Sequence, residues 1–362
     1  MEMQINRTDL HTIRCSEPVA RDLEVGQARF AISTYGITAN NITYAVFGDM
    51  MQYWEFFPTR IEADRGEWGV MPVWGFADVV ESKNSALAVG TRVFGYFPFG
   101  SELIVEPGRF DDSGFNDMAP HRQKLPTVYN RYAYTSTDKQ YSVENEPYIL
   151  LLRPLFTTSF VMNDFLVDHD FFGATTIIVS SASAKTSLGS VVGLRQTHGS
   201  DLRIVGLTSP GNLEFCQSLA CYDEVLTYDQ VGELPLTPSV YVDVAGRRDV
   251  TFTLHAHFGN NLKYSMIVGD THWDNHDEIS GDLAGPKPEF LFAPVQIAKR
   301  RTDWGRDGFE DKISVAWDYF VEWVKNWLVI LPVTDDEASM AAYRAVLEGS
   351  INPATGYVVT QL

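Results

Sequence analysis

The residues best suited to chemistry lie in segment 175–186, where an apolar strand runs into a turn of small side chains. A helix follows from Ser187, and a second apolar strand covers residues 202–207. Strand, small-residue turn, helix and strand in this order form the unit that binds a dinucleotide pyrophosphate at a helix N-terminus. The groups that this turn offers to a phosphate are Ser181, Ser183, Ala184, Lys185 and Thr186. The segment therefore predicts a dinucleotide cofactor.

The end of the second strand bears on the choice of cofactor. NAD enzymes usually place Asp or Glu there to bind the ribose hydroxyls. This chain has Thr208 and Ser209, followed by Asn212. Because the missing carboxylate leaves room for a 2′-phosphate, the sequence favours NADPH over NADH. Tyr228 ends the next strand, where it either contacts the cofactor or packs as a strand-end aromatic residue.

A second group of candidate residues is aromatic. Tyrosine in an apolar site can donate a hydrogen bond or a proton to a substrate. Tyr53 is the first candidate for this role and Tyr44 the second, while Tyr129 and Asn130 would cap a substrate pocket. A purely apolar wall remains the alternative for each tyrosine. The many Trp, Phe and Met residues near these positions predict an apolar or aromatic substrate.

Composition excludes some classes of protein. The chain has 362 residues, enough for about two or three domains. Its net charge of -19 argues against nucleic acid and anionic membrane surfaces, which both favour clustered Lys and Arg. The odd set of Cys15, Cys216 and Cys221 contains no CxxC pair, which favours a reducing, cytoplasmic setting. We also expect no signal core and no apolar run long enough to span a bilayer.

The chain divides into four sections by pattern. Short strands at 28–33, 76–80, 90–96 and 101–106 predict a small barrel or sandwich. The polar, aromatic segment from about Arg109 to Pro147 is expected to be an irregular functional loop or lid. Strands then alternate with helices from Leu155 to Gly269, which indicates a parallel sheet. A tail of helices at 315–328 and 337–347 and a strand at 356–360 is expected to pack back on the first section.

Several motifs resemble the medium-chain dehydrogenase/reductase superfamily, in its zinc-free quinone and enoyl reductase branch. Residues 36–42 followed by Gly48 resemble its Gly-Leu-Asn-x-x-Asp-Val…Gly segment, and 89–95 its Val-Gly-Asp-Arg-Val turn. Residues 219–228 resemble the Leu-Gly-Ala-Asp…Tyr stretch, and 242–246 the Asp-x-x-Gly that ends a nucleotide-domain strand. Residues 74–80 and 153–160 are similar to the corresponding segments of a bacterial subgroup of unknown function inside this superfamily.

The resemblance implies an α/β fold in which a Rossmann-type parallel-sheet domain accompanies a discontinuous GroES-like β-barrel catalytic domain. The barrel domain would cover residues 1–150 and 299–362, and the dinucleotide-binding domain 151–298. A tyrosine in the loop corresponding to Tyr53 donates the proton in enoyl reductases of this branch. The further positions that the resemblance assigns to the cofactor are Ala245, Gly269 and Phe292, and those assigned to the substrate are Asn41 and Trp54. Superfamily membership also implies a homodimer.

The chain departs from the family in two places. Ser180, Ser183, Ala184 and Thr186 stand where the family's phosphate turn has Gly, which permits positive φ and close backbone approach. The turn either binds a dinucleotide with altered geometry or has become a close-packed structural turn. Thr38 stands where zinc-dependent members have a cysteine ligand, and the four-cysteine lobe is missing, so no metal is expected.

These observations predict an NADPH-dependent, zinc-free reductase of an enone, quinone, enoyl or carbonyl substrate. Two alternatives remain open. The same fold could perform redox-neutral lyase or isomerase chemistry with bound cofactor. The second alternative is a non-catalytic binding protein that has lost the dinucleotide, and the turn without glycine supports it.

Overall fold

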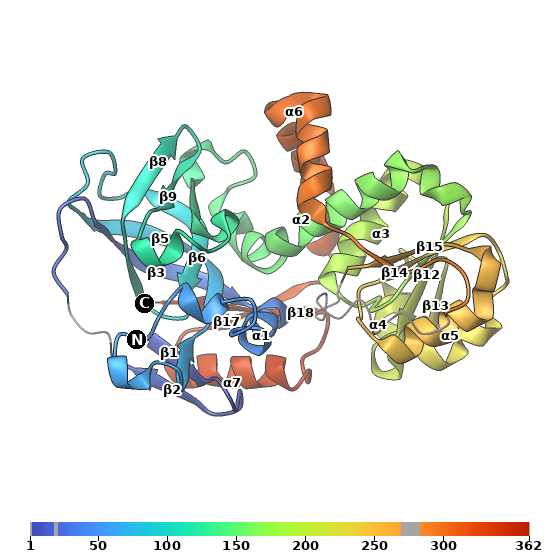
Figure 1. Ribbon diagram of the computed structural model, residues 1–362, viewed down its shortest axis with the longest axis horizontal. Helices are drawn as coiled ribbons and strands as arrows, with labels where there is room; N and C mark the ends of the chain where they lie inside the picture. Colours follow the sequence, from blue (N-terminus) through green and yellow to red (C-terminus); the bar gives the residue numbers. More distant parts are fainter. Residues whose placement is uncertain (1, 18–20, 269–282, 362) are drawn as a thin grey trace. The chain divides into compact units, whose positions relative to one another are not determined.

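The computed structural model describes residues 2–17, 21–268 and 283–361. The chain forms two compact units (Figure 1). Unit 1 comprises Met1–Leu151 and Leu328–Leu362, and unit 2 comprises Leu152–Trp327. Gly269, which the sequence analysis assigns to the cofactor, lies outside the described residues.

Unit 1 is built on a nine-stranded sheet and a three-stranded sheet. The strands are β1 (Glu2–Asn6), β2 (Ile13–Ser16), β3 (Ala28–Ile37), β4 (Trp68–Val70), β5 (Pro72–Ser82), β6 (Arg92–Pro98), β7 (Glu102–Val105), β8 (Pro107–Asp111), β9 (Gly114–Asp117), β10 (Arg131–Tyr134), β17 (Val329–Val333) and β18 (Thr355–Thr360). The helices are α1 (Ala39–Val46) and α7 (Asp336–Leu347), with short 3-10 helices η1 (Tyr53–Glu55), η2 (Glu62–Asp64), η3 (Pro120–Arg122), η4 (Thr127–Asn130), η5 (Thr135–Thr137) and η6 (Val143–Asn145). The large sheet runs β17-β18-β3-β5-β6-β10-β9-β8, and β7 also pairs with β3.

The alternating burial along β3 shows why this segment forms a strand. Residues Ala28, Phe30 and Ile32 are buried in the core, while the residues between them are partly exposed. This period of two places one face of the strand against the apolar interior. The tail also packs where the sequence predicts, because β18 pairs antiparallel with β3.

Segment 109–147 corrects an expectation in part, because it contains short strands of the large sheet and is not irregular throughout. Strands β9 and β10 pair with each other, and β10 also pairs with β6. Phe115 and Tyr132 are fully buried, and their rings stack with centroids 5.5 Å apart. The sequence signal was weak because the strands are short and separated by two 3-10 turns.

Unit 2 contains a six-stranded parallel sheet surrounded by helices (Figure 1). Its strands are β11 (Thr176–Val179), β12 (Arg203–Thr208), β13 (Glu224–Thr227), β14 (Ser239–Asp243), β15 (Leu262–Ile267) and β16 (Glu289–Phe290). The helices are α2 (Glu146–Asp168), which begins in unit 1, α3 (Lys185–His198), α4 (Leu213–Ser218), α5 (Arg248–Phe258) and α6 (Ala293–Val324). The short 3-10 helices are η7 (Asp170–Gly173), η8 (Pro210–Asn212), η9 (Tyr228–Glu233) and η10 (Gly259–Asn261).

The strand order of this sheet is β13-β12-β11-β14-β15-β16. In chain order this is 3-2-1-4-5-6, the arrangement of a doubly wound dinucleotide fold. The order reverses between β11 and β14, which are parallel neighbours. Ligands of such sheets bind outside the carboxyl ends of the strands at this point, so the turn after β11 lies where a dinucleotide pyrophosphate belongs.

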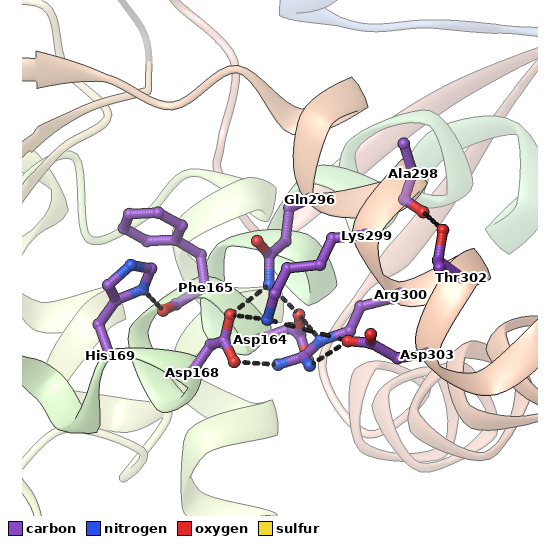
Figure 2. A network of polar contacts seen from close by, with 10 residues as sticks. All are labelled: Asp164, Phe165, Asp168, His169, Gln296, Ala298, Lys299, Arg300, Thr302 and Asp303. Atoms are coloured by element: carbon purple, nitrogen blue, oxygen red, sulfur yellow. Dashed lines mark hydrogen bonds and ion pairs between the residues drawn. The ribbon is translucent and has the colours of Figure 1, made fainter.

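Helix α6 belongs to unit 2, although the sequence analysis assigns residues from 299 onward to the barrel domain. Ion pairs attach its first turns to α2 (Figure 2). Arg300 Nε donates to Asp164 Oδ2 at 2.7 Å, and its Nη2 lies 2.9 Å from Asp168 Oδ1. Lys299 also donates to Asp168. Further along, Phe320 stacks on Phe156 of α2 with ring centroids 5.2 Å apart.

Helix α2 also differs from an expectation. Among the described residues, one stretch, Val143–Asp168, is long and apolar enough to cross a membrane by length and composition. The sequence analysis expected no such run. Half of its apolar window is buried inside the protein, and the core helix of a protein without any membrane span passes the same test.

Candidate functional site

The turn after β11 is tied to the end of β14 by one serine. Ser180 is fully buried, and its Oγ donates to Asp243 Oδ1 at 2.8 Å. The same oxygen accepts from the backbone N–H groups of Val244 and Ala245, both at 2.9 Å. Ser180 therefore fixes the two strand ends that flank the reversal of strand order, and it also engages the amide of the predicted cofactor residue Ala245.

Ser181 takes a backbone conformation that favours glycine. Its φ is +50°, in the left-handed region that costs a residue with Cβ about 1–2 kcal/mol. Its N–H donates to the Tyr228 hydroxyl at 3.1 Å, which offsets part of that cost. Ala182 fits beside it because Gly206 in β12 has no side chain; a Cβ there would lie 2.9 Å from the Ala182 Cβ. The small residue needed for close approach thus stands in the neighbouring strand.

Other predicted cofactor residues also meet at this turn. Asn212 Nδ2 donates to Ser183 Oγ at 3.0 Å, which joins the turn to the segment after β12. Thr208 is buried at the end of β12, and Ser209, half-buried, directly precedes η8. Ala184 is the residue before α3, and Thr186 lies in the first turn of that helix. The structure therefore joins Asn212 to the turn and places the other selected residues at the end of β12 and at the start of α3.

Lys185 is the first residue of α3, at the positive end of the helix dipole. Desolvation by burial lowers the pKa of its amine to about 8. An anion beside this amine would favour its charged form. A helix N-terminus with a desolvated lysine is suited to a phosphate.

Arg247 is a candidate that the sequence analysis missed. It follows β14, and its guanidinium carbon lies 5.0 Å from the centroid of the Tyr228 ring. Two adjacent arginines after the Val-Asp-Val-Ala-Gly stretch were the available signal. Phe292, by contrast, is 60% exposed and directly precedes α6.

The predicted tyrosines of unit 1 meet in one aromatic cluster. Tyr53 and Tyr129 are half-buried, and their hydroxyl oxygens are 3.4 Å apart. Tyr44 lies beside Tyr53 with ring centroids 4.8 Å apart. Tyr96 supports the group, with its ring centroid 4.7 Å from that of Tyr129. Burial raises the pKa of Tyr129 well above the ordinary value, so its hydroxyl stays protonated.

Tyr44 has the most developed polar environment of the cluster. The Trp74 indole Nε1 donates to its hydroxyl at 3.0 Å, and Asn40 Nδ2 donates at 2.6 Å. A hydroxyl that accepts two hydrogen bonds keeps its own hydrogen available to donate. Burial raises the pKa of Tyr44 above the ordinary value, and the Trp74 hydrogen bond opposes that rise.

A buried arginine holds the turn that carries Tyr129. Arg122 is 1% exposed and pairs with Asp117 at 2.9 Å. Its Nε donates to Asn130 Oδ1 at 3.0 Å, and its Nη2 donates to the Tyr129 carbonyl at 2.7 Å. Asn130, a predicted substrate residue, donates back to the Arg122 carbonyl at 2.9 Å. The amide of Asn130 is therefore part of a buried structural network.

The remaining predicted substrate residues also have structural contacts. Asn41 caps α1, since its Oδ1 accepts from the Thr38 N–H at 2.7 Å, and its Nδ2 donates to the Pro72 carbonyl at 2.9 Å. Trp54 is 1% exposed and packs in the main core of unit 1. In the part of the chain that the structure describes, no group of three or more His, Cys, Asp or Glu side chains could hold a metal ion.

A family model described as "Protein of unknown function (DUF2855)" matches residues 35–352. A comparison with curated proteins found no match. CurA from Vibrio vulnificus, solved in complex with NADPH, is a similar structure with a TM-score of 0.57 and 12% identity, over 97% of this chain and 94% of that chain. TarJ from S. aureus, also in complex with NADPH, gives a TM-score of 0.54 at 11% identity over 100% of both chains. A mutant enoyl thioester reductase from Candida tropicalis gives 0.53 at 12% identity, over 99% of this chain and 100% of that chain.

These similarities confirm the fold that the sequence predicted. The chain has the α/β fold of these similar structures, with a Rossmann-type sheet and a GroES-like domain. The prediction of a group of unknown function inside this fold is also confirmed. At these identities the similarity concerns the fold, and the chemistry must be argued from the residues.

Proposed function

The chain belongs to the DUF2855 family of proteins of unknown function, and we propose that it is an NADPH-dependent, zinc-free reductase. The substrate would be an apolar or aromatic enone, quinone, enoyl compound or carbonyl compound. Unit 2 would bind the cofactor and unit 1 would supply the proton. The proposal is supported by two similar structures solved with NADPH and by one named as an enoyl thioester reductase.

The observation that carries the proposal is the set of donors around the turn after β11. Ser183, Lys185 and Thr186 offer hydroxyl and amine groups at the N-terminus of α3. Thr208 and Ser209 end β12 without a carboxylate, where an NAD enzyme would bind the ribose. This donor set fits a dinucleotide with an added phosphate, so Ser209, Asn212 and Tyr228 would hold the ribose end. NADPH, when bound, supplies a hydride.

The aromatic cluster suits the transfer of a proton. Tyr44 is our first candidate on structural grounds, because its hydroxyl accepts from Trp74 and Asn40. Burial disfavours the phenolate that forms when Tyr44 releases its proton, and these two donors offset part of that cost. Tyr53 is the second candidate and Tyr129 the third, since their hydroxyls lie close together at the half-buried side of the cluster. The surrounding rings favour a substrate with an apolar or aromatic body.

A binding titration with NADPH and NADH, followed by tryptophan fluorescence, tests the cofactor. We expect tight NADPH binding and weak NADH binding. Oxidation of NADPH by a panel of enones, quinones and enoyl thioesters then tests the reaction. Tyr44→Phe should lower turnover by about 10²–10⁴-fold. Its affinity for NADPH should match the wild type, because the change leaves the proposed phosphate and ribose groups of unit 2 intact. Turnover equal to that of the wild type in both Tyr44→Phe and Tyr53→Phe would exclude both tyrosines as proton donors.

A second candidate function is favoured by the internal bonds of the turn. The N–H of Ser181 donates to Tyr228, that of Ala182 to the Leu207 carbonyl, and that of Ala184 to the Ser181 carbonyl. Backbone N–H groups that already donate inside the protein do not donate to a pyrophosphate. A binding protein that has lost the dinucleotide would show no affinity for either nucleotide, so the same titration separates the two candidates.

We further propose that the protein works in a reducing, cytoplasmic compartment as a homodimer. Cys15, Cys216 and Cys221 are free thiols, and two of them are buried. Strand β16 ends the parallel sheet and provides an edge at which a second copy could pair. Light scattering of the purified protein tests the dimer.

A further inference from the structure

Arg247 stands beside the ribose end of the proposed cofactor site. The chain leaves β14 at Asp243, and Val244 and Ala245 are held by Ser180 of the phosphate turn. Gly246 donates to Asp243 Oδ1 at 3.0 Å and has a φ of +64°, which turns the chain before Arg247. The guanidinium then lies over the Tyr228 ring, 5.0 Å from its centroid. These contacts thus fix the place of this cation.

Tyr228 connects Arg247 with the phosphate turn. Its hydroxyl accepts from the Ser181 N–H at 3.1 Å, so the end of the side chain contacts the turn. The guanidinium of Arg247 packs over the Tyr228 ring. In the sequence, Tyr228 directly follows β13, which is the strand next to β12 in the sheet. The group that distinguishes the two nicotinamide cofactors belongs near the end of β12. Arg247 is therefore on the side of the site where a 2′-phosphate would need a cation.

The charges around Arg247 leave it able to bind an anion. Asp243 is buried and bound by Ser180, Gly246 and Thr251. Asp249 pairs with Arg247, but the two side chains are 66% and 50% exposed. Exposed pairs contribute little, so a phosphate dianion can displace the carboxylate. A guanidinium packed over a ring can still present N–H groups for bidentate bonds to phosphate oxygens.

We propose that Arg247 selects NADPH by binding the 2′-phosphate, with Tyr228 as the platform that orients the guanidinium. The inference rests on the proposed function and adds the residue that would set its cofactor preference. It also explains how the chain could discriminate although Asn212, in the segment after β12, carries no charge. The alternative is that Arg247 only holds the Tyr228 ring in place, which would affect both cofactors equally.

The test is fluorescence titration of full-length wild-type and Arg247→Gln protein with NADPH and NADH. Competition by adenosine 2′,5′-bisphosphate and by 5′-AMP adds a readout that involves no nicotinamide. Arg247→Gln should weaken NADPH and the bisphosphate roughly 10- to 100-fold, the effect of losing a charged hydrogen bond, and leave NADH and 5′-AMP within about 3-fold. Arg203→Gln is the matched control, because Arg203 also pairs with an exposed carboxylate but lies at the opposite end of β12.

Two more variants make the outcome decisive. Arg247→Lys keeps the charge and should retain part of the preference for NADPH. Asp249→Asn removes the competing carboxylate and should tighten NADPH binding by a few fold, without a change for NADH. Tight NADPH binding that Arg247→Gln leaves unchanged, or an equal loss for both cofactors, would overturn the role of Arg247 and leave the proposed function standing. Wild-type protein that binds neither cofactor would overturn the proposed function and this inference together.

Discussion

Replacing Arg122 with methionine should strongly destabilise unit 1. The guanidinium is 1% exposed and donates to Asp117, Asn130, Tyr132 and the Tyr129 carbonyl, over distances of 2.7–3.0 Å. Asp117 is 3% exposed, so removal of Arg122 leaves a buried carboxylate without its cation. Breaking a buried pair from one side costs about 3–5 kcal/mol. For a unit of this size the melting temperature should fall by about 6–20 °C.

Urea unfolding with hydrogen exchange of peptides from segment 107–134 measures this loss where it arises. Arg203→Met is the control, since its partner Glu224 is 39% exposed and such a pair is worth about 0–1 kcal/mol. Arg122→Lys keeps a charge near Asp117 and should lose less stability than Arg122→Met. The double variant Asp117→Asn with Arg122→Met should be more stable than the two single changes predict when added, because no isolated charge remains.

A free energy of unfolding within about 1 kcal/mol of wild type in Arg122→Met would refute this reasoning. It would mean that water reaches Asp117 and replaces the arginine. The turn that carries Tyr129 would then have another support. Unchanged exchange in segment 107–134 would lead to the same conclusion, independently of the global unfolding transition.

Three further changes probe other parts of the protein. Gly48→Ala should cost about 1–3 kcal/mol in urea unfolding, because a Cβ would lie 2.0 Å from the Trp54 indole nitrogen. The contribution of Lys185 to stability should rise from about pH 8 to pH 10, since its pKa of about 8 lies below the unfolded value and the unfolded state binds more protons there. Burial raises the pKa of Cys216 and Cys221, which act in the opposite direction, so the measurement is the difference between wild type and Lys185→Met in a pH series of unfolding free energies. Arg300→Met should raise hydrogen exchange in the first turns of α6, because its partly buried pair with Asp164 attaches this helix to α2.

Much of the fold follows from local pattern. The strand at 28–33 was predicted from alternation, and β3 has the alternating burial that this pattern requires. Strands β11, β12 and β14 were predicted as apolar runs, as expected for strands covered on both faces. Segment 109–147 could not be predicted in this way. Its strands are four or five residues long, and their stability depends on pairing with β6, which is distant in the sequence, and on the buried network around Arg122.

In the candidate site, too, some residues can be identified from the local sequence and others only from the folded structure. The chain's own order places Ser183, Lys185 and Asn212 near one strand end, so their types and spacing were sufficient to select them. Arg247 is 19 residues beyond Tyr228 in the sequence, and only the parallel pairing of the sheet brings the two side chains together. Asn41 and Asn130 show the opposite case, because their polar groups looked available in the sequence and are used for capping and for Arg122.

The turn without glycine shows why motif matching alone misjudges this site. Glycine in such a turn supplies positive φ and close packing, and this chain meets both needs by other means. Ser181 adopts the left-handed conformation and is held by Tyr228, while Gly206 in the adjacent strand provides the space for Ala182. Ser180 then fixes the turn to β14. Tyr228 and the end of β14 hold the turn in place of glycine. The same two parts of the chain also place Arg247 beside the proposed cofactor.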